Sequence, residues 1–135
     1  MKLYVGESNS QVADAMVLGL SDSIPLTHLL ELEIRNALRL KCARGELTLA
    51  GMNSALADFQ SDIDIGRYHR PAYRLENIFR RAEVLSRHHA VRSKCRSLDV
   101  LHVAAALEIQ CQEFASFDER QRTVAGEAGL IILPR

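Results

Sequence analysis

The chain has 135 residues, 47% hydrophobic and 25% charged, and its 17 basic and 17 acidic side chains cancel. These values are ordinary for one folded globular domain, and they exclude a disordered chain, a collagen-like repeat and a disulfide scaffold. The neutral balance argues against a strongly basic nucleic-acid binder but leaves a local basic patch open. The sequence has no apolar run of the roughly 20 residues that a membrane helix needs, no signal-peptide pattern and no CxxC pair. We therefore expect a single cytoplasmic domain over residues 1–135 that does not enter a membrane.

Helical and extended patterns alternate in the first half of the chain. Thr27 stands where it would cap the strongest helical stretch, and Gly45 and Gly66 stand where two helices are expected to end. Apolar residues at helical spacing predict that each of these two helices buries one face. The expected elements are a strand at 1–5, a helix at 11–18, a short strand at 24–26, helices at 29–43 and 48–65, and an edge strand at 67–70.

The second half continues the alternation. A helix at 75–89 is expected to turn Ile78, Phe79, Ala82 and Leu85 inward. The next helix, at 98–109 with Ser97 as its cap, is apolar almost all round, which is typical of a buried helix. A strand at 113–117, a helix at 119–128 and a strand at 130–133 complete the chain. Short strands alternating with helices predict an α/β fold with a small parallel sheet flanked by several helices.

Three carboxylates stand out against this pattern. Asp118 directly follows an expected strand, and ligands of open parallel sheets bind beyond the carboxyl ends of the strands. Asp99 lies in the first turn of the apolar helix, where it would also suit the helix dipole. Glu33 lies beside an apolar stripe, although a solvated face shared with Glu31 and Arg35 is an equal alternative. Carboxylate clusters hold Mg²⁺ or Mn²⁺ next to substrate phosphates, so these acids predict a hard-cation site.

Three segments of the chain resemble PIN-domain proteins, and VapC-type toxins of bacterial toxin–antitoxin pairs in particular. They agree with that family in both order and spacing. The first is Pro25-Leu26-Thr27 followed by residues 32–40, the second is residues 96–106, and the third is residues 114–121 with Ala125 and Gly129-Leu130.

The resemblance implies a PIN-like three-layer fold and a Mg²⁺- or Mn²⁺-dependent endoribonuclease. Glu33, Asp99 and Asp118 would be its metal-binding and catalytic acids. Ser116 would be a supporting hydroxyl, at a position where the family usually has Thr. Arg96 would meet a substrate phosphate, with a plain surface salt bridge as the alternative. The implied partners are an RNA substrate, a cognate antitoxin and a second copy of the chain, for which the apolar region 29–56 would supply the surface.

The start of the chain departs from the family pattern, which opens with a central strand ending in Asp-x-Ser. In one alignment the domain is shortened by about a dozen residues and lacks that strand and its acid. In the other, residues 1–5 are the strand, Gly6 replaces the acid and Glu7 reaches in from one place later. Unpaired strand edges are a hazard, so we expect residues 1–5 to join the sheet, its neighbours to close up, or a partner chain to fill the gap.

The missing acid leaves a second function open. In that alternative, the chain is a catalytically impaired PIN-like module that acts by dimerisation or by binding an antitoxin or RNA. A third and generic interpretation is a helical α/β domain whose acids serve as helix caps.

Overall fold

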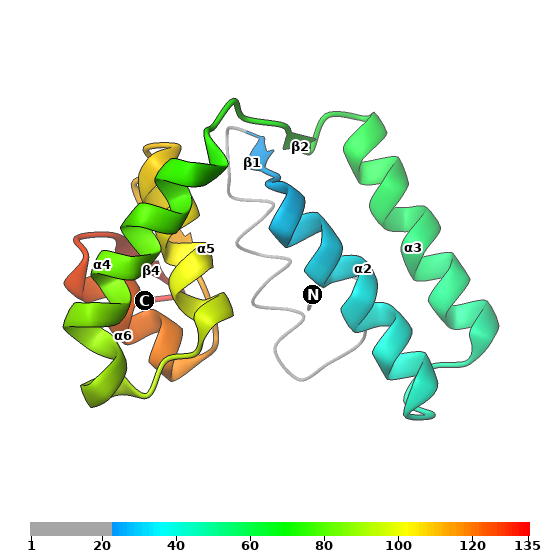
Figure 1. Ribbon diagram of the computed structural model, residues 1–135. Helices are drawn as coiled ribbons and strands as arrows, with labels where there is room; N and C mark the ends of the chain where they lie inside the picture. The colour runs from blue at the N-terminus through cyan, green and yellow to red at the C-terminus, as the bar shows by residue number, and fades with distance from the viewer. Residues whose placement is uncertain (1–22) are drawn as a thin grey trace. The chain divides into compact units, whose positions relative to one another are not determined.

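The computed structural model describes residues 23–135, so the strand expected at 1–5, the helix expected at 11–18 and the side chain of Glu7 lie outside the described residues. Five helices and four short strands occupy the described range, in two compact units (Figure 1). One unit ends at Pro71 and the other spans Ala72–Arg135. The architecture is helix-rich α/β with parallel strand pairing, as expected. A single domain over residues 1–135 stays a prediction, and each unit is described below by itself.

In the first unit, two helices connect two parallel strands. The elements are β1 (Ile24–Pro25), α2 (His28–Ala43), α3 (Leu49–Asp64) and β2 (Tyr68–His69). The predicted cap is confirmed, since Thr27 Oγ1 accepts a hydrogen bond from the backbone N–H of Leu30 at 3.2 Å. Gly45 and Gly66 follow the two helices with positive φ angles of 76° and 87°. Glycine adopts this left-handed conformation without steric cost, which explains why the helices end there.

The core of this unit lies between α2, α3 and the strand pair. Phe59 is completely buried and meets the ring of Tyr68 edge to face, with 5.4 Å between ring centroids. The guanidinium of Arg35 lies 5.0 Å from the centroid of the Phe59 ring. The apolar stripes predicted for the two helices are thus the faces that meet. The buried residues are Leu26, Ile34, Leu38, Ala55, Phe59 and Tyr68.

In the second unit, three helices pack with a second pair of parallel strands. The elements are α4 (Leu75–Ser93), α5 (Ser97–Glu108), β3 (Glu113–Ala115), α6 (Glu119–Glu127) and β4 (Ile131–Leu133). The strands pair in parallel, with Glu113 opposite Ile131. α4 continues past the predicted end at residue 89 and stops where Lys94 takes a left-handed φ of 56°. α5 begins at Ser97, so its cap is Arg96 and not Ser97.

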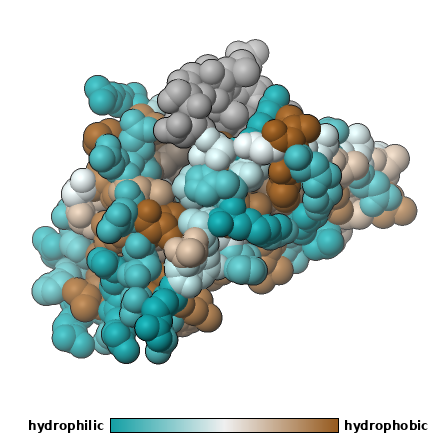
Figure 2. Space-filling model, turned by 90° about the horizontal axis from the view of Figure 1, so that it is seen from above, coloured by the Kyte–Doolittle hydropathy of each residue, from teal (hydrophilic) through white to brown (hydrophobic). Residues whose placement is uncertain are grey.

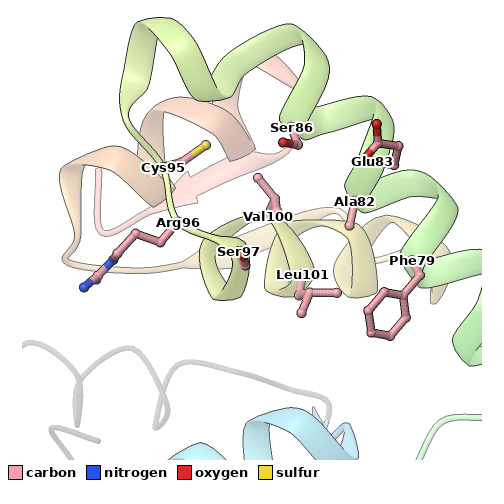
Figure 3. A pocket seen from close by; sticks show the side chains of 9 residues that line it. All are labelled: Phe79, Ala82, Glu83, Ser86, Cys95, Arg96, Ser97, Val100 and Leu101. Carbon is pink, nitrogen blue, oxygen red and sulfur yellow. The ribbon is translucent and has the colours of Figure 1, made fainter.

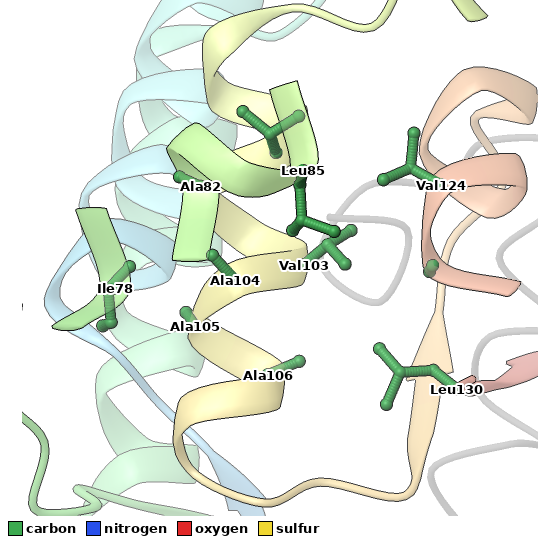
Figure 4. Packing of buried hydrophobic residues seen from close by; sticks show 11 residues of the cluster. Ile78, Ala82, Leu85, Val103, Ala104, Ala105, Ala106, Val124 and Leu130 are labelled. Atoms are coloured by element: carbon green, nitrogen blue, oxygen red, sulfur yellow. The ribbon is translucent and has the colours of Figure 1, made fainter. Parts of the chain in front are cut away.

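α5 supplies more of the core of the second unit than any other helix does, as its apolar sequence predicts. Figure 4 shows Ala104 and Ala105 of α5 facing Ile78 and Ala82 of α4, with Val124 of α6 and Leu130 across the core. The expected inward position of Phe79 is wrong, because 54% of this residue is exposed. The inward face of α4 is occupied by its neighbours at helical spacing, Ile78, Ala82 and Leu85, and position 79 falls beside that face.

The strands form two separate two-stranded sheets within residues 23–135, one in each unit. Cys42, Cys95 and Cys111 are free thiols, in agreement with the sequence. None of the helices described is long and apolar enough to span a membrane.

Candidate metal centre

Asp99 is the one buried acidic side chain in the part of the chain that the structure describes, with 6% of the residue exposed. It is the third residue of α5, and its Oδ2 accepts the backbone N–H of Arg96 at 2.8 Å. No described residue makes a hydrogen bond to its Oδ1. Oδ1 is therefore the oxygen of Asp99 that a cation would bind.

Arg96 lies beside this carboxylate at the start of α5. Its Nε is 3.6 Å from Asp99 Oδ2, and its side chain is 72% exposed. The structure thus contains the salt bridge that the sequence offered as an alternative. An ion pair so open to water contributes little stability, so the guanidinium retains most of its capacity to meet a further anion. Arg96 also lines a pocket of about 260 Å³ between α4 and α5, with Phe79 at the opposite end (Figure 3).

Asp118 caps α6 at the carboxyl end of the β3–β4 pair. Its Oδ1 accepts the backbone N–H of Gln121 at 3.0 Å, and its own N–H donates to Ser116 Oγ at 3.1 Å. Its Oδ2 has no hydrogen bond from the described residues. The side chain is exposed at the edge where both strands end. The structure thus places Asp118 where parallel sheets bind ligands, and it places the Ser116 hydroxyl directly against the backbone of Asp118.

Glu33 belongs to the other unit, on α2. It is half-buried, between exposed Leu32 and buried Ile34, and so lies at the margin of the apolar stripe. Its neighbour Glu31 faces Arg70 and Arg35, and both arginines donate to its carboxylate. The hydrogen bond from Arg70 holds the pKa of Glu31 below its ordinary value of 4.5, and the ion pair with Arg35 acts in the same direction.

The described residues do not form a complete metal site. Asp99 and Asp118 lie in one unit and Glu33 in the other. Nowhere between residues 23 and 135 do three His, Cys, Asp or Glu side chains come together in a group able to hold a metal ion. The structure does provide two aspartates in one unit. One carboxylate oxygen of each accepts a backbone N–H at the start of a helix, and the other oxygen has no hydrogen bond from the described residues.

Sequence reasoning missed Arg122, which is central to the Asp118 side of the site. Its guanidinium donates to three backbone carbonyl oxygens where β3 and β4 end: Ser116 at 2.8 Å, Leu133 at 3.1 Å and Pro134 at 2.8 Å. The available signal was its position four residues after Asp118. Long side chains on a helix point back over the preceding turn, here toward the strand ends.

The comparisons with known proteins are negative: no protein-family model matches the chain, and no curated protein matches it.

Proposed function

We propose that this chain is a PIN-type, metal-dependent endoribonuclease of the VapC kind, with Glu33, Asp99 and Asp118 as its metal-binding and catalytic acids. The proposal depends on the three motifs in family order. The observation that carries it is the buried Asp99, whose Oδ1 has no hydrogen bond from the residues described. Its Oδ2 accepts the backbone N–H of Arg96, so Oδ1 is the oxygen that the cation would bind.

The donor chemistry of the two aspartates fits Mg²⁺ or Mn²⁺. Both ions prefer carboxylate oxygens and retain sites for water and for substrate phosphate. When bound, such an ion lowers the pKa of a water molecule and neutralises charge on a phosphodiester under attack. The protein would contribute orientation: helix caps fix one oxygen each of Asp99 and Asp118, and Ser116 holds the backbone N–H of Asp118. Arg96 would attract the RNA phosphates.

The same proposal includes the remaining family properties. The two units would be parts of one PIN-like three-layer domain, acting in the cytoplasm. A cognate antitoxin would restrain it, and two copies would associate through the apolar region 29–56, whose exposed residues include Leu32, Leu40 and Leu49. The missing first acid would be compensated by Glu7 or left without a replacement.

A second candidate is a PIN-like binding module that does not cleave RNA. It is favoured by the absence of a three-ligand group among residues 23–135. Large apolar side chains that a partner would cover also lie at the surface. On the face in Figure 2, hydrophobic residues form small separate patches among hydrophilic ones. The most exposed are Val91, Ile65, Leu49, Leu32 and Leu75.

Titration of the metal-free chain with Mn²⁺ by isothermal calorimetry separates the two candidates. The nuclease proposal predicts saturable binding that is lost in Asp99→Asn and weakened at least about 10-fold in Asp118→Asn, because each variant removes a charged ligand. The amide oxygen introduced by Asp99→Asn can still accept the Arg96 N–H, so the fold should persist. Asp58→Asn, an exposed change on α3, is the matched control and should bind as the wild type does.

Cleavage of RNA is measured next, with Mn²⁺ and with EDTA. Metal-dependent cleavage that disappears in Asp99→Asn supports the nuclease. A folded wild-type chain that binds no Mn²⁺ and cuts no RNA would exclude the nuclease and leave the binding module.

A further inference from the structure

Arg122 connects the two strands of the second unit at the edge where Asp118 stands. One nitrogen, Nη1, donates to the carbonyl of Ser116 just after β3 and to that of Leu133 at the end of β4. The other, Nη2, donates to the carbonyl of Pro134. Strand ends leave carbonyls without ladder partners, and a planar guanidinium can satisfy several of them at fixed angles.

These bonds continue directly into the candidate site. The backbone of Ser116 is bound on both sides, since its carbonyl accepts from Arg122 and its N–H donates to Leu133 O at 3.1 Å. The Ser116 hydroxyl then holds the N–H of Asp118. Arg122 itself begins on the first turn that Asp118 caps, where its N–H donates to Asp118 O at 2.9 Å. The turn 116–118 is thus held between the strand ends and the helix.

The charge of Arg122 argues against a simple electrostatic role. No carboxylate among the described residues pairs with it, and all its acceptors are backbone carbonyls. An unneutralised positive charge close to a cation site opposes cation binding by Coulomb repulsion. If Arg122 raises the affinity of the site for a cation, it must therefore do so through the geometry that it imposes on the turn 116–118.

We infer that Arg122 is a positioning residue: it fixes the turn 116–118 so that the free oxygen of Asp118 is held ready for the divalent cation. This inference rests on the proposed function, because it assigns Arg122 to the metal site proposed there. Arg122 acts through Ser116 and the strand ends, and it is not itself a ligand. Residues that orient a metal ligand without touching the metal change metal affinity by about 10- to 100-fold.

The test compares Arg122→Lys and Arg122→Met by Mn²⁺ calorimetry. Lysine retains the charge but cannot span three carbonyls with a rigid fork, whereas methionine removes both the charge and the fork. Positioning predicts that both variants bind Mn²⁺ at least about 10-fold more weakly than the wild type. Electrostatics alone predicts unchanged binding in the lysine variant and tighter binding in the methionine variant. Arg80→Met, an exposed arginine on α4, is the matched control and should bind as the wild type does.

Amide hydrogen exchange, followed by NMR without metal, gives an independent readout. In Arg122→Lys the Ser116 amide should lose protection, while the Ile131 amide, which bonds Gln112 O at 2.9 Å at the other end of the strand pair, keeps it. Unchanged protection of the Ser116 amide would overturn the inference. Lost protection with unchanged Mn²⁺ affinity would overturn it too, because Arg122 would then stabilise the turn without affecting metal binding. If the wild type binds no Mn²⁺, the proposed function fails, and with it the assignment of Arg122 to a metal site. The exchange data then still show whether Arg122 orders the turn.

Discussion

At the scale of single residues, short-range hydrogen bonds decide where the candidate acids lie. Asp118 caps its own helix, and Asp99 reaches back to the N–H of Arg96. α5 begins one residue earlier than its pattern indicates, and the residue before it, Arg96, donates its N–H to the carboxylate of Asp99. In both aspartates, capping occupies one oxygen and leaves the second for another role. The same aspartate side chain can therefore accept a hydrogen bond at a helix start with one oxygen and bind a cation with the other.

Glu31 gives a prediction at this scale. Its pKa is lowered in the folded chain, chiefly by the hydrogen bond from Arg70. The ionised form is thus favoured by folding, and its contribution to stability is complete above the ordinary value of 4.5 and is lost as the pH falls through the lowered pKa. Glu31→Gln lacks this contribution at every pH. Urea unfolding should show the variant less stable than the wild type at pH 7, with a difference that shrinks below pH 4.5.

Glu46→Gln is the control for this experiment, because Glu46 is exposed and its carboxylate pairs only loosely with Lys41, at 3.5 Å. Its effect should be small and nearly constant across the same range. A Glu31→Gln variant whose difference from the wild type grew on acidification would contradict the assigned sign.

At the scale of elements, packing separates residues that look alike in the sequence. Phe59 and Phe79 both lie in amphipathic helices beside apolar neighbours, where the sequence predicts that one face is buried. Phe59 is completely buried between α2, α3 and β2, whereas Phe79 is 54% exposed on α4. The difference arises because Ile78, Ala82 and Leu85 already fill the side of α4 that meets α5.

The same substitution at the two phenylalanines should therefore have different costs. Phe59→Ala leaves a cavity and removes the edge-to-face contact with Tyr68, so it should lower the free energy of unfolding by about 3–5 kcal/mol. Phe79→Ala should change it by less than about 1 kcal/mol, as is usual for exposed positions. Chemical denaturation followed by circular dichroism measures both. Equal losses at the two positions would refute the packing described for α2 and α3.

At the scale of the whole molecule, the charge balance is the dominant feature. The 17 basic and 17 acidic side chains cancel, and the isoelectric point is about 7.0. A neutral protein has little net repulsion between copies. This chain also exposes several large apolar side chains, including Leu49 and Ile65 on and next to α3.

Solubility should therefore be lowest near pH 7 and should rise on either side, as the chain becomes cationic below and anionic above that value. Precipitation with polyethylene glycol at about pH 5.5, 7.0 and 8.5 and constant ionic strength measures this. The folded state is checked at each pH by circular dichroism. A monotonic trend across pH 7 would show that local patches outweigh net charge.

Local patterns were sufficient to predict most elements in residues 23–135 and the residues that end them. Thr27 as a cap, Gly45 and Gly66 as stops, the buried character of α5 and the parallel direction of the strands all follow from interactions within a few residues or from alternation along the chain. The same patterns singled out Asp99 and Asp118, because an acid in the first turn of an apolar helix and an acid after a strand are visible without any fold.

Features that depend on contacts far apart in the chain were decided by the tertiary structure. The exposure of Phe79 depends on what α5 presents to α4, and the burial of Asp99 depends on the packing around the start of α5. Arg122 acquires its position from carbonyls that end two different strands, one of them before it in the chain and the other after it. The periodicity of apolar residues cannot predict such long-range contacts. It shows which side of a helix or strand is apolar, but not which groups of other elements pack against that side.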